Sequence, residues 1–425
     1  MHRHRGAYYQ WLGGAYHDKA DDGIRALLYA DISKLRDATD AGMDLIDPDK
    51  RMIDNHMDAL KAVAHLDEAI EAAAWLGEPP PGMPADELLS MRNGILHLPT
   101  RRLVPHTPAM FTYNALPFDY DPNIPVPVVW LEFLDSLWPD DPQSIATLRE
   151  VFGLCLTRNT AFQKNFLILG PQRSGKGTIA RTLRAMLGTL NVVSPSLASL
   201  GGEFGLEQLI GKLVAIISDA RMGGKTDADL IVERLLNISG EDAVAVNRKN
   251  RSFWNGQLLV RVIMLANGLP RFNDPSGAFA NRFVILRIVP SFLGQEDLTL
   301  GKRLLGELPG ILNWSIGGWE SLKERGFFTQ PNSGREDVKQ MQDMVSPISV
   351  FVRDSCEVGA GFRELKPDLY YSWKGWCIGQ GREPGSVSHF GRTLKEVVPL
   401  LGESRPWQEG PRPEYYTGIK LKPAA

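Results

Sequence analysis

The spacing of apolar and polar residues divides the chain into helical and strand-forming regions. Apolar residues recur at helical spacing over residues 22–35, 56–76, 129–137, 143–156 and 300–325, and over 348–355, 367–377 and 386–398. Between residues 160 and 290, short apolar runs alternate with helical segments. The expected strands are 166–169, 213–218, 260–266 and 283–288. This alternation is typical of an α/β domain with a largely parallel sheet and helices on both faces.

Turn-forming residues and polar stretches suggest the domain organisation. The pair Gly13-Gly14 between aromatic residues indicates a short hairpin, and Asn93-Gly94 indicates a tight turn. The polar residues 332–345 are expected to form a linker or an exposed helix. We predict a mainly helical, collar-like accessory domain and then the α/β domain, a linker and a C-terminal domain, with the boundaries 1–140, 141–330, 331–345 and 346–425.

Composition restricts the class of protein. The chain has 425 residues, of which 43% are hydrophobic and 23% charged, as in ordinary globular proteins. No apolar run approaches the ~20 residues of a membrane span, and the N-terminus lacks the apolar segment of a secretory signal. The three cysteines are far apart, which fits a reducing cytoplasm and gives no metal-site spacing. The net charge of −3 neither requires nor excludes a nucleic-acid partner.

A glycine-rich loop follows the first expected strand. Consecutive backbone N–H groups and a helix N-terminus form an anion site there, and a lysine can reach the outer phosphates of a nucleotide. The loop therefore predicts a nucleoside triphosphate as the ligand, and an NTPase also needs Mg²⁺ near the outer phosphates. Its residues are Gly170, Pro171, Gln172, Arg173, Ser174, Gly175, Lys176, Gly177 and Thr178. Gly177 stands where such loops commonly have a Ser or Thr that meets Mg²⁺, and Thr178 follows one residue later.

Polar residues at the ends of later strands can complete a nucleotide site. Asp219 ends the strand 213–218 and is the expected Mg²⁺ ligand together with Thr178, although an aspartate in this position can simply cap a turn. Because Ala220 follows, a second carboxylate is missing there. The base that activates water stays open between Asp219 itself, Glu203, Asp242 and a neighbouring subunit.

Two further segments supply an amide and positive charge. Asn267 ends the strand 260–266, where it can contact the γ-phosphate or orient water, or can form a turn with Gly268. Arg282 precedes the last strand and can reach the γ-phosphate of a neighbouring subunit or stay solvated. A third segment has the spacing of a hairpin tip, and its basic residues are Arg248, Lys249 and Arg251. These residues can contact phosphates of DNA or of the nucleotide, or can form a solvated charged turn.

In this order, the segments resemble superfamily 3 helicases of the phage and plasmid primase-helicase type, which are related to poxvirus primase-helicases. The resemblance runs from about residue 76 to about residue 400. It rests on residues 91–98, 116–122, 152–157, 238–242, 246–249, 266–283 and 307–314.

The resemblance implies an AAA+-like P-loop ATPase that forms a ring, expected to be a hexamer, and moves 3′ to 5′ along single-stranded or forked DNA. It implies phosphate contacts by Lys176 and Thr178, and Mg²⁺ at Asp219. It also implies that Asn267 is a sensor, that Arg282 is an arginine finger acting across the subunit interface, and that the hairpin near Lys249 points into the channel. Gly177, and Ser218 in place of a second carboxylate, depart from the family pattern.

The C-terminal domain resembles the winged-helix module that often accompanies these helicases. Its recognition helix would present Ser388, His389, Arg392 and Lys395 to DNA. About 75 residues precede the resemblance, too few for an ordinary primase domain, so we expect a helicase without its own priming activity. A separate primase or replication initiator is the expected partner. The implied setting is a phage, plasmid or satellite in a bacterial host cytoplasm.

Two other functions remain possible from the residues. The segment Gly175–Thr178 is similar to the phosphate loop of small-molecule kinases, which would be compact monomers that bind a second nucleotide. The missing second carboxylate suits a DNA-binding initiator that uses ATP only to assemble.

Overall fold

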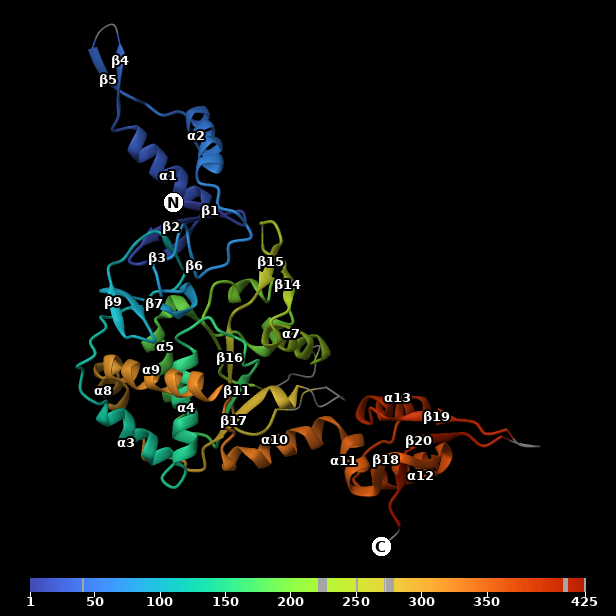
Figure 1. Cartoon of the computed structure of the whole chain (residues 1–425). Coiled ribbons are helices and arrows are strands. Elements are labelled where there is room, and N and C mark those ends of the chain that lie inside the picture. The colour runs from blue at the N-terminus through green and yellow to red at the C-terminus, as the bar shows by residue number, and fades with distance from the viewer. Residues whose placement is uncertain are drawn as a thin grey trace.

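The computed structural model describes residues 1–39, 42–220, 228–249, 251–270, 272, 279–407 and 412–423 (Figure 1). Its centre is a five-stranded parallel sheet in the order β12-β13-β16-β11-β17. The strands are β11 (Asn165–Leu169), β12 (Val192–Val193), β13 (Val214–Ile217), β16 (Arg261–Ala266) and β17 (Phe283–Arg287). The four expected strands are confirmed. The edge strand β12 escaped sequence analysis because two residues give no periodic signal.

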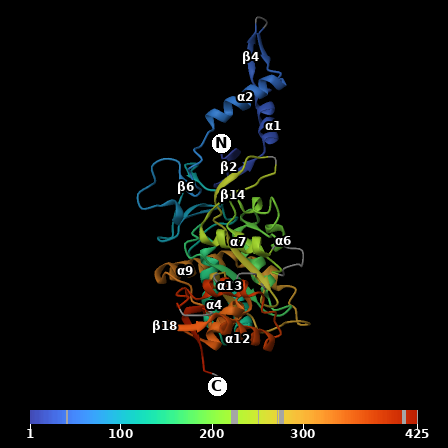
Figure 2. The same cartoon turned by 90° about the vertical axis from the view of Figure 1, so that its right-hand side faces the viewer.

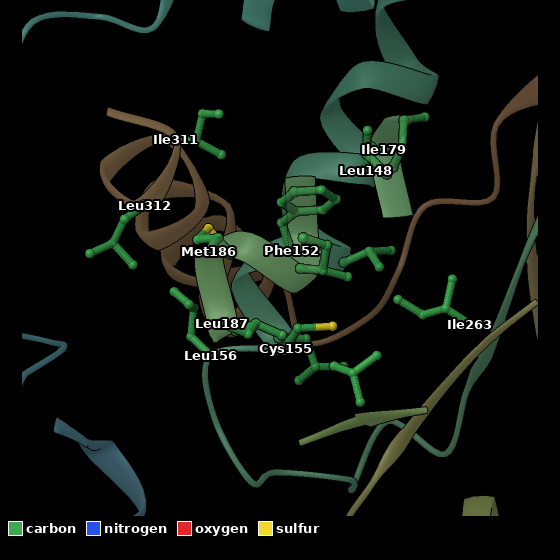
Figure 3. Close-up of a cluster of buried hydrophobic side chains, with 14 of the residues drawn as sticks. Leu148, Phe152, Cys155, Leu156, Ile179, Met186, Leu187, Ile263, Ile311 and Leu312 are labelled. Carbon is green, nitrogen blue, oxygen red and sulfur yellow. The ribbon is translucent and has the colours of Figure 1, made fainter. Parts of the chain in front are cut away.

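Successive residues of the central strands pack into two different hydrophobic clusters. In β11, Phe166 and Ile168 belong to one cluster, whereas Leu167 and Leu169 belong to the other. Both faces of the sheet are therefore buried, which explains why its strands are continuous apolar runs. Figure 3 shows part of the first cluster. Helices that contribute to this first cluster include α3 (Val128–Leu137), α4 (Pro142–Leu154), α5 (Lys176–Leu187) and α9 (Leu308–Arg325). Helices α6 (Leu197–Leu200) and α7 (Ala228–Gly240) contribute to the second.

The expectation that residues 1–140 are mainly helical is wrong, because the described residues of this part form ten short strands beside its helices. The helices α1 (Asp21–Ile32) and α2 (Lys50–Val63) lie with the hairpin of β4 (Arg36–Thr39) and β5 (Gly42–Leu45) at one end of the molecule (Figures 1 and 2). The other strands are β1 (His2–His4), β2 (Ala7–Leu12), β3 (Ala15–Lys19), β6 (Ala74–Trp75), β7 (Leu88–Met91), β8 (Gly94–His97), β9 (Arg102–Val104) and β10 (Met110–Phe111). The predicted turns at Gly13-Gly14 and Asn93-Gly94 are confirmed as the β2–β3 and β7–β8 hairpins.

The predicted helix 56–76 starts earlier and is shorter. Asp49 caps α2 by accepting a hydrogen bond of 2.7 Å from the backbone N–H of Met52, and the helix ends at Val63. Beyond it, Leu66 and Ala72 pack with Tyr16. The apolar residues after Val63 thus face the N-terminal strands and do not continue the apolar face of α2.

The chain leaves the sheet through α8 (Leu300–Gly306), α9 and α10 (Asn332–Val345). Residues 332–345, expected as a linker or exposed helix, form α10, which contacts β17 through an ion pair between Arg287 and Asp337. A separate hydrophobic cluster then forms around Phe351, Trp373 and Phe390. Its elements are α11 (Pro347–Ser355), β18 (Cys356–Leu365), α12 (Lys366–Gly379), α13 (Val387–Val397), β19 (Gly402–Ser404) and β20 (Tyr415–Leu421), with antiparallel strands in the order β18-β20-β19. The three predicted helices of this part are confirmed.

Within the described part of the chain, no helix combines the length and apolar character needed to cross a membrane.

Candidate functional site

The loop between β11 and α5 lies at the carboxyl end of β11, an inner strand of the sheet between β16 and β17. The backbone N–H of Gly170 donates to the carbonyl of Ala266 at 3.2 Å, which joins the start of the loop to the end of β16. Gly175 has a φ of +87°, and a side chain there would meet Leu137 at 2.9 Å and Phe133 at 3.1 Å. Only glycine accommodates both this backbone conformation and this contact with α3. The loop leads directly into the N-terminus of α5, as an anion site requires.

The ammonium group of Lys176 is enclosed by the loop and hydrogen-bonds to its oxygen atoms. Its Nζ donates to the carbonyls of Gly170 and Pro171, each at 2.6 Å, and to Ser174 Oγ at 3.1 Å. The residue is 8% exposed, and burial lowers its pKa. A cation held only by neutral oxygen atoms keeps its charge available, so an entering phosphate can take their place.

A cavity of about 900 Å³ opens beside this loop, within the size range of small-molecule sites. Loop residues from Gln172 to Thr178 line it, with Ser218 after β13 and Asn267 after β16. The carboxyl ends of three neighbouring parallel strands thus converge on one space. The structure places Lys176, Thr178 and Asn267 together there, as sequence analysis expected.

The expected acidic residues lie differently. Asp219 is exposed beside Ser218, and it is Ser218 that lines the cavity. Glu203 accepts a hydrogen bond of 2.9 Å from Asn247, and Asp242 lies near Gly240. Neither Glu203 nor Asp242 is among the described residues that line the cavity. The carboxylates that do line it are Glu132, Glu296 and Asp297.

Arg282 lies at the opposite end of the sheet from the loop. It ends a 3₁₀ turn, η4 (Ala280–Arg282), immediately before β17, and its Nη1 donates to Gln163 Oε1 at 2.9 Å and to the carbonyl of Ser239 at 3.1 Å. In the parallel pair of β11 and β17, Asn165 is opposite Phe283. The five residues of β11 therefore separate Arg282 from the loop of its own chain by roughly 17 Å.

Sequence analysis missed most of the positive charge around the cavity. Arg181 and Arg184 line it from α5, where their helical spacing after the loop could have revealed them, and Arg303 lines it from α8. Arg181 Nη2 donates to Thr178 Oγ1 at 3.1 Å. Arg303 pairs with Asp297, and Arg173 pairs with Glu296 at 3.4 Å. The expected Mg²⁺ ligand Thr178 therefore lies beside a guanidinium group.

The basic cluster lies at the tip of a hairpin, as predicted, between β14 (Ala243–Val246) and β15 (Trp254–Gln257). Arg248 is 5% exposed, which does not suit the predicted DNA contact. Arg251 forms an ion pair of 2.8 Å with Asp18. Lys249 is exposed, and Phe253, which sequence analysis missed although it follows the cluster directly, is 62% exposed.

The four predicted DNA-contacting residues of α13 are all exposed: Ser388, His389, Arg392 and Lys395. The opposite side of the helix packs into the C-terminal core through Phe390 and Leu394. Lys395 also forms an ion pair with Glu403. A polar face with two basic residues is thus turned away from the C-terminal core.

Two family matches cover different parts of the chain. Residues 4–139 match the family described as "D5 N terminal like", and residues 168–282 match a "Family of unknown function (DUF5906)". The first match begins at residue 4, so the likeness to known proteins extends further towards the N-terminus than the resemblance from about residue 76 suggested.

Solved structures share the fold over nearly the whole chain. An apo structure of the NrS-1 C terminal region has a TM-score of 0.58 at 12% identity, covering 98% of this chain and 94% of that chain. An A form apo structure of the same region has a TM-score of 0.53 at 12% identity with the same coverage. At this identity the similarity establishes a common fold, including the N-terminal and C-terminal units on either side of the sheet.

Proposed function

We propose that this chain is an ATP-dependent DNA helicase of a mobile genetic element, acting in the host cytoplasm as a ring, which we take to be a hexamer. The observation that carries the proposal is that two cations, Lys176 and Arg282, lie at opposite ends of the neighbouring strands β11 and β17. Lys176 lies in the loop after β11, whereas Arg282 lies before the neighbouring β17. A site that needs both cations is completed by a second subunit, which is the arrangement of a ring with an arginine finger.

ATP would bind in the cavity beside the loop. The loop amides and Lys176 would hold its phosphates, and Asn267 would contact the γ-phosphate or the attacking water. Mg²⁺ is usually held by one or two protein groups and by substrate phosphates. Thr178 lines the cavity and would hold this ion together with the phosphates, and Asp219, which follows the cavity-lining Ser218, is the proposed second ligand. Bound Mg²⁺ would neutralise charge that develops on the phosphates.

Two surfaces would contact DNA. At the hairpin tip, exposed Lys249 and Phe253 combine a cation with an aromatic ring, which suits single-stranded DNA in a channel. The C-terminal unit has the order helix, strand, helix, helix, strand, strand, which supports a winged helix with α13 as the recognition helix. The resemblance further suggests 3′-to-5′ movement and a separate primase or replication initiator as a partner.

One observation favours a second candidate. Ser218 lines the cavity where the exposed Asp219 was expected, and Glu203 and Asp242 lie elsewhere. Of the carboxylates that do line the cavity, Glu296 and Asp297 are paired with Arg173 and Arg303. A site in which no carboxylate activates water would bind ATP without hydrolysing it. The alternative function is therefore an initiator that assembles on DNA with ATP.

ATP hydrolysis measured with and without single-stranded DNA, together with the particle mass with and without ATP, separates these functions. The helicase predicts DNA-stimulated hydrolysis by a particle several times the monomer mass. ATP-dependent assembly without hydrolysis would refute the helicase and support the initiator. A monomer that transfers phosphate to a second nucleotide would refute both and identify a kinase.

A further inference from the structure

The turn between β1 and β2 contacts the β14–β15 hairpin tip. Arg5 and Gly6 have φ values of 46° and 75°, so the chain reverses within two residues. A side chain on Gly6 would lie 3.2 Å from Ser252 Oγ. The reversal therefore brings the N-terminal turn into van der Waals contact with a segment more than two hundred residues later in the chain.

Arg248 connects the tip of the β14–β15 hairpin to this turn by hydrogen bonds. Its Nη2 donates to the carbonyl of Arg5 at 3.0 Å, and its Nε donates to the carbonyl of Ser252 at 2.8 Å. Because Arg248 is 5% exposed, water cannot easily replace these acceptors. Arg248, the first residue of the basic cluster, is thus a structural element of the hairpin.

Arg5 connects three segments at once. Its guanidinium lies over the ring of Trp254 at the start of β15, 5.1 Å from the ring centroid. Its Nε and Nη2 donate to the carbonyl of Glu68 at 3.2 and 3.0 Å, and it forms an ion pair with Glu71. A side chain on Gly256 would lie 2.8 Å from Arg5 Nη1, so glycine leaves the space that Arg5 occupies.

A second contact lies on the other side of the tip. Arg251 pairs with Asp18 of β3 at 2.8 Å, with both side chains partly exposed. The backbone N–H of Lys249 donates to Glu207 Oε2 at 3.3 Å, while the residue itself is exposed. Two of the three cations of the tip are therefore engaged with the N-terminal strands, and Lys249 is left facing solvent.

We infer that the N-terminal turn clamps the β14–β15 hairpin, and that Arg5 is a positioning residue for Lys249 and Phe253. An isolated two-stranded hairpin is only marginally stable, so it could not transmit force to DNA unless it were braced. The clamp makes the hairpin and the β1–β2–β3 sheet one body. The inference rests on the proposed function only where it assigns DNA to the hairpin.

The first test needs no DNA. The full chain and its Arg5→Ala variant are digested briefly with trypsin, and cleavage after Lys249 and Arg251 is followed by mass spectrometry. Arg5→Ala removes the side-chain contacts to Trp254, Glu68 and Glu71 and keeps the carbonyl that Arg248 contacts. Loss of these side-chain contacts should raise the rate of cleavage at the tip about tenfold, because proteolysis follows the population of the locally open form. Arg363→Ala removes a similar arginine–aromatic contact, 5.2 Å from Tyr415, and should leave tip cleavage unchanged.

Folding and function are then measured on the same proteins. Arg5→Lys keeps a cation for Trp254 but loses the forked donors to Glu68, so its tip cleavage should be intermediate. Arg5→Ala should hydrolyse ATP normally without DNA, require more single-stranded DNA for half-maximal stimulation and unwind less DNA per ATP. Unchanged tip cleavage in Arg5→Ala would overturn the role of the Arg5 side chain in the clamp, and with it the positioning role. Faster cleavage with unchanged unwinding would overturn the positioning role.

The two proposals fail in different ways. A wild-type protein without DNA-stimulated hydrolysis would refute the proposed function, and tip cleavage would still decide whether the clamp exists. If Arg5→Ala lowers the thermal unfolding midpoint of the whole chain, Arg5→Lys supplies the comparison instead, because it retains the partly buried cation.

Discussion

The ammonium nitrogen of Lys176 lies 2.6 Å from the carbonyl oxygen of Gly170, the residue that begins the loop around it. The side chain therefore folds back along its own loop, and the loop is shaped around a cation before any anion enters. This geometry leads to the first prediction.

Replacing Lys176 by Ala should weaken ATP binding and reduce hydrolysis by at least about 10²-fold, since a preorganised donor to developing negative charge is lost. Hydrolysis is measured at saturating ATP, and binding with a fluorescent ATP analogue. Lys302→Ala, which removes an exposed lysine of α8 outside the cavity lining, should change neither quantity. Normal hydrolysis in Lys176→Ala would place the nucleotide elsewhere.

Arg282 leads to a prediction about pairs of subunits. Arg282→Ala should still bind ATP but hydrolyse it about 10³-fold more slowly, because the arginine serves the neighbouring site. Mixed in equal amounts with Lys176→Ala, it should recover activity at about one quarter of the interfaces, those where the intact lysine faces an intact arginine.

The control mixture combines Lys176→Ala with Asn267→Ala. Both residues line the same cavity within one chain, so no interface regains a complete site and the mixture should stay inactive. If the first mixture also stays inactive while its particles keep the mass of the ring, Arg282 does not act between subunits.

Four strands of the central sheet were predictable from sequence because each of them is buried on both faces and is therefore a continuous apolar run. The N-terminal part was not, because its strands are short and pair with distant segments. In one such pair, Trp75 of β6 lies opposite Met110 of β10, two strands of two residues each. Nothing in the local pattern around either strand indicates its partner.

In the candidate site, too, local motifs could be predicted from sequence, whereas contacts between distant segments could not. The loop from Gly170 to Thr178 is a local motif, so its residues could be identified directly. The difference between buried Arg248 and exposed Lys249 depends on a carbonyl of Arg5, which only the tertiary structure brings close. Arg303 likewise reaches the cavity from α8, and its position in the sequence gives no sign of it.

The ion pair between Arg287 and Asp337 should stabilise the contact between β17 and α10. The Asp337 side chain is 2% exposed, so its removal leaves the facing guanidinium without its buried partner. Because the Arg287 side chain is 39% exposed and water can solvate it, Asp337→Ala should lower the free energy of unfolding by about 2 kcal/mol. Asp343→Ala breaks a more exposed pair with Arg353 and should cost less than about 1 kcal/mol. Urea unfolding curves measure both, and equal losses would contradict the assignment.

The C-terminal unit should lose stability in acid through Glu403. Hydrogen bonds from Lys366, and then from Lys395, lower the pKa of this carboxyl to about 2. An unfolded glutamate has a pKa of about 4.3, so the carboxylate stabilises the fold above that pH, and its contribution is lost as the pH falls towards 2. The group is exposed, so the effect should be small.

Thermal unfolding midpoints at pH 6 and pH 3 test this dependence. Glu403→Gln should be less stable than wild type at pH 6, and the difference should narrow at pH 3. Glu383→Gln, which changes an exposed glutamate between α12 and α13, should follow wild type at both values. A constant difference between Glu403→Gln and wild type would show that the carboxylate charge contributes nothing.

Arg392 tests whether α13 is a DNA-contacting helix. It is exposed on the face opposite the buried Phe390 and Leu394, so its removal should leave the C-terminal core intact. Arg392→Ala should weaken duplex binding, and the slope of log affinity against log salt should fall by about 1 if the guanidinium contacts one phosphate. Lys374→Ala removes an exposed cation from α12 instead. If α13 lies against the duplex, removing Arg392 should change the slope more than removing a cation from α12. An equal change in both slopes would therefore mean that the C-terminal unit attracts DNA by its general charge.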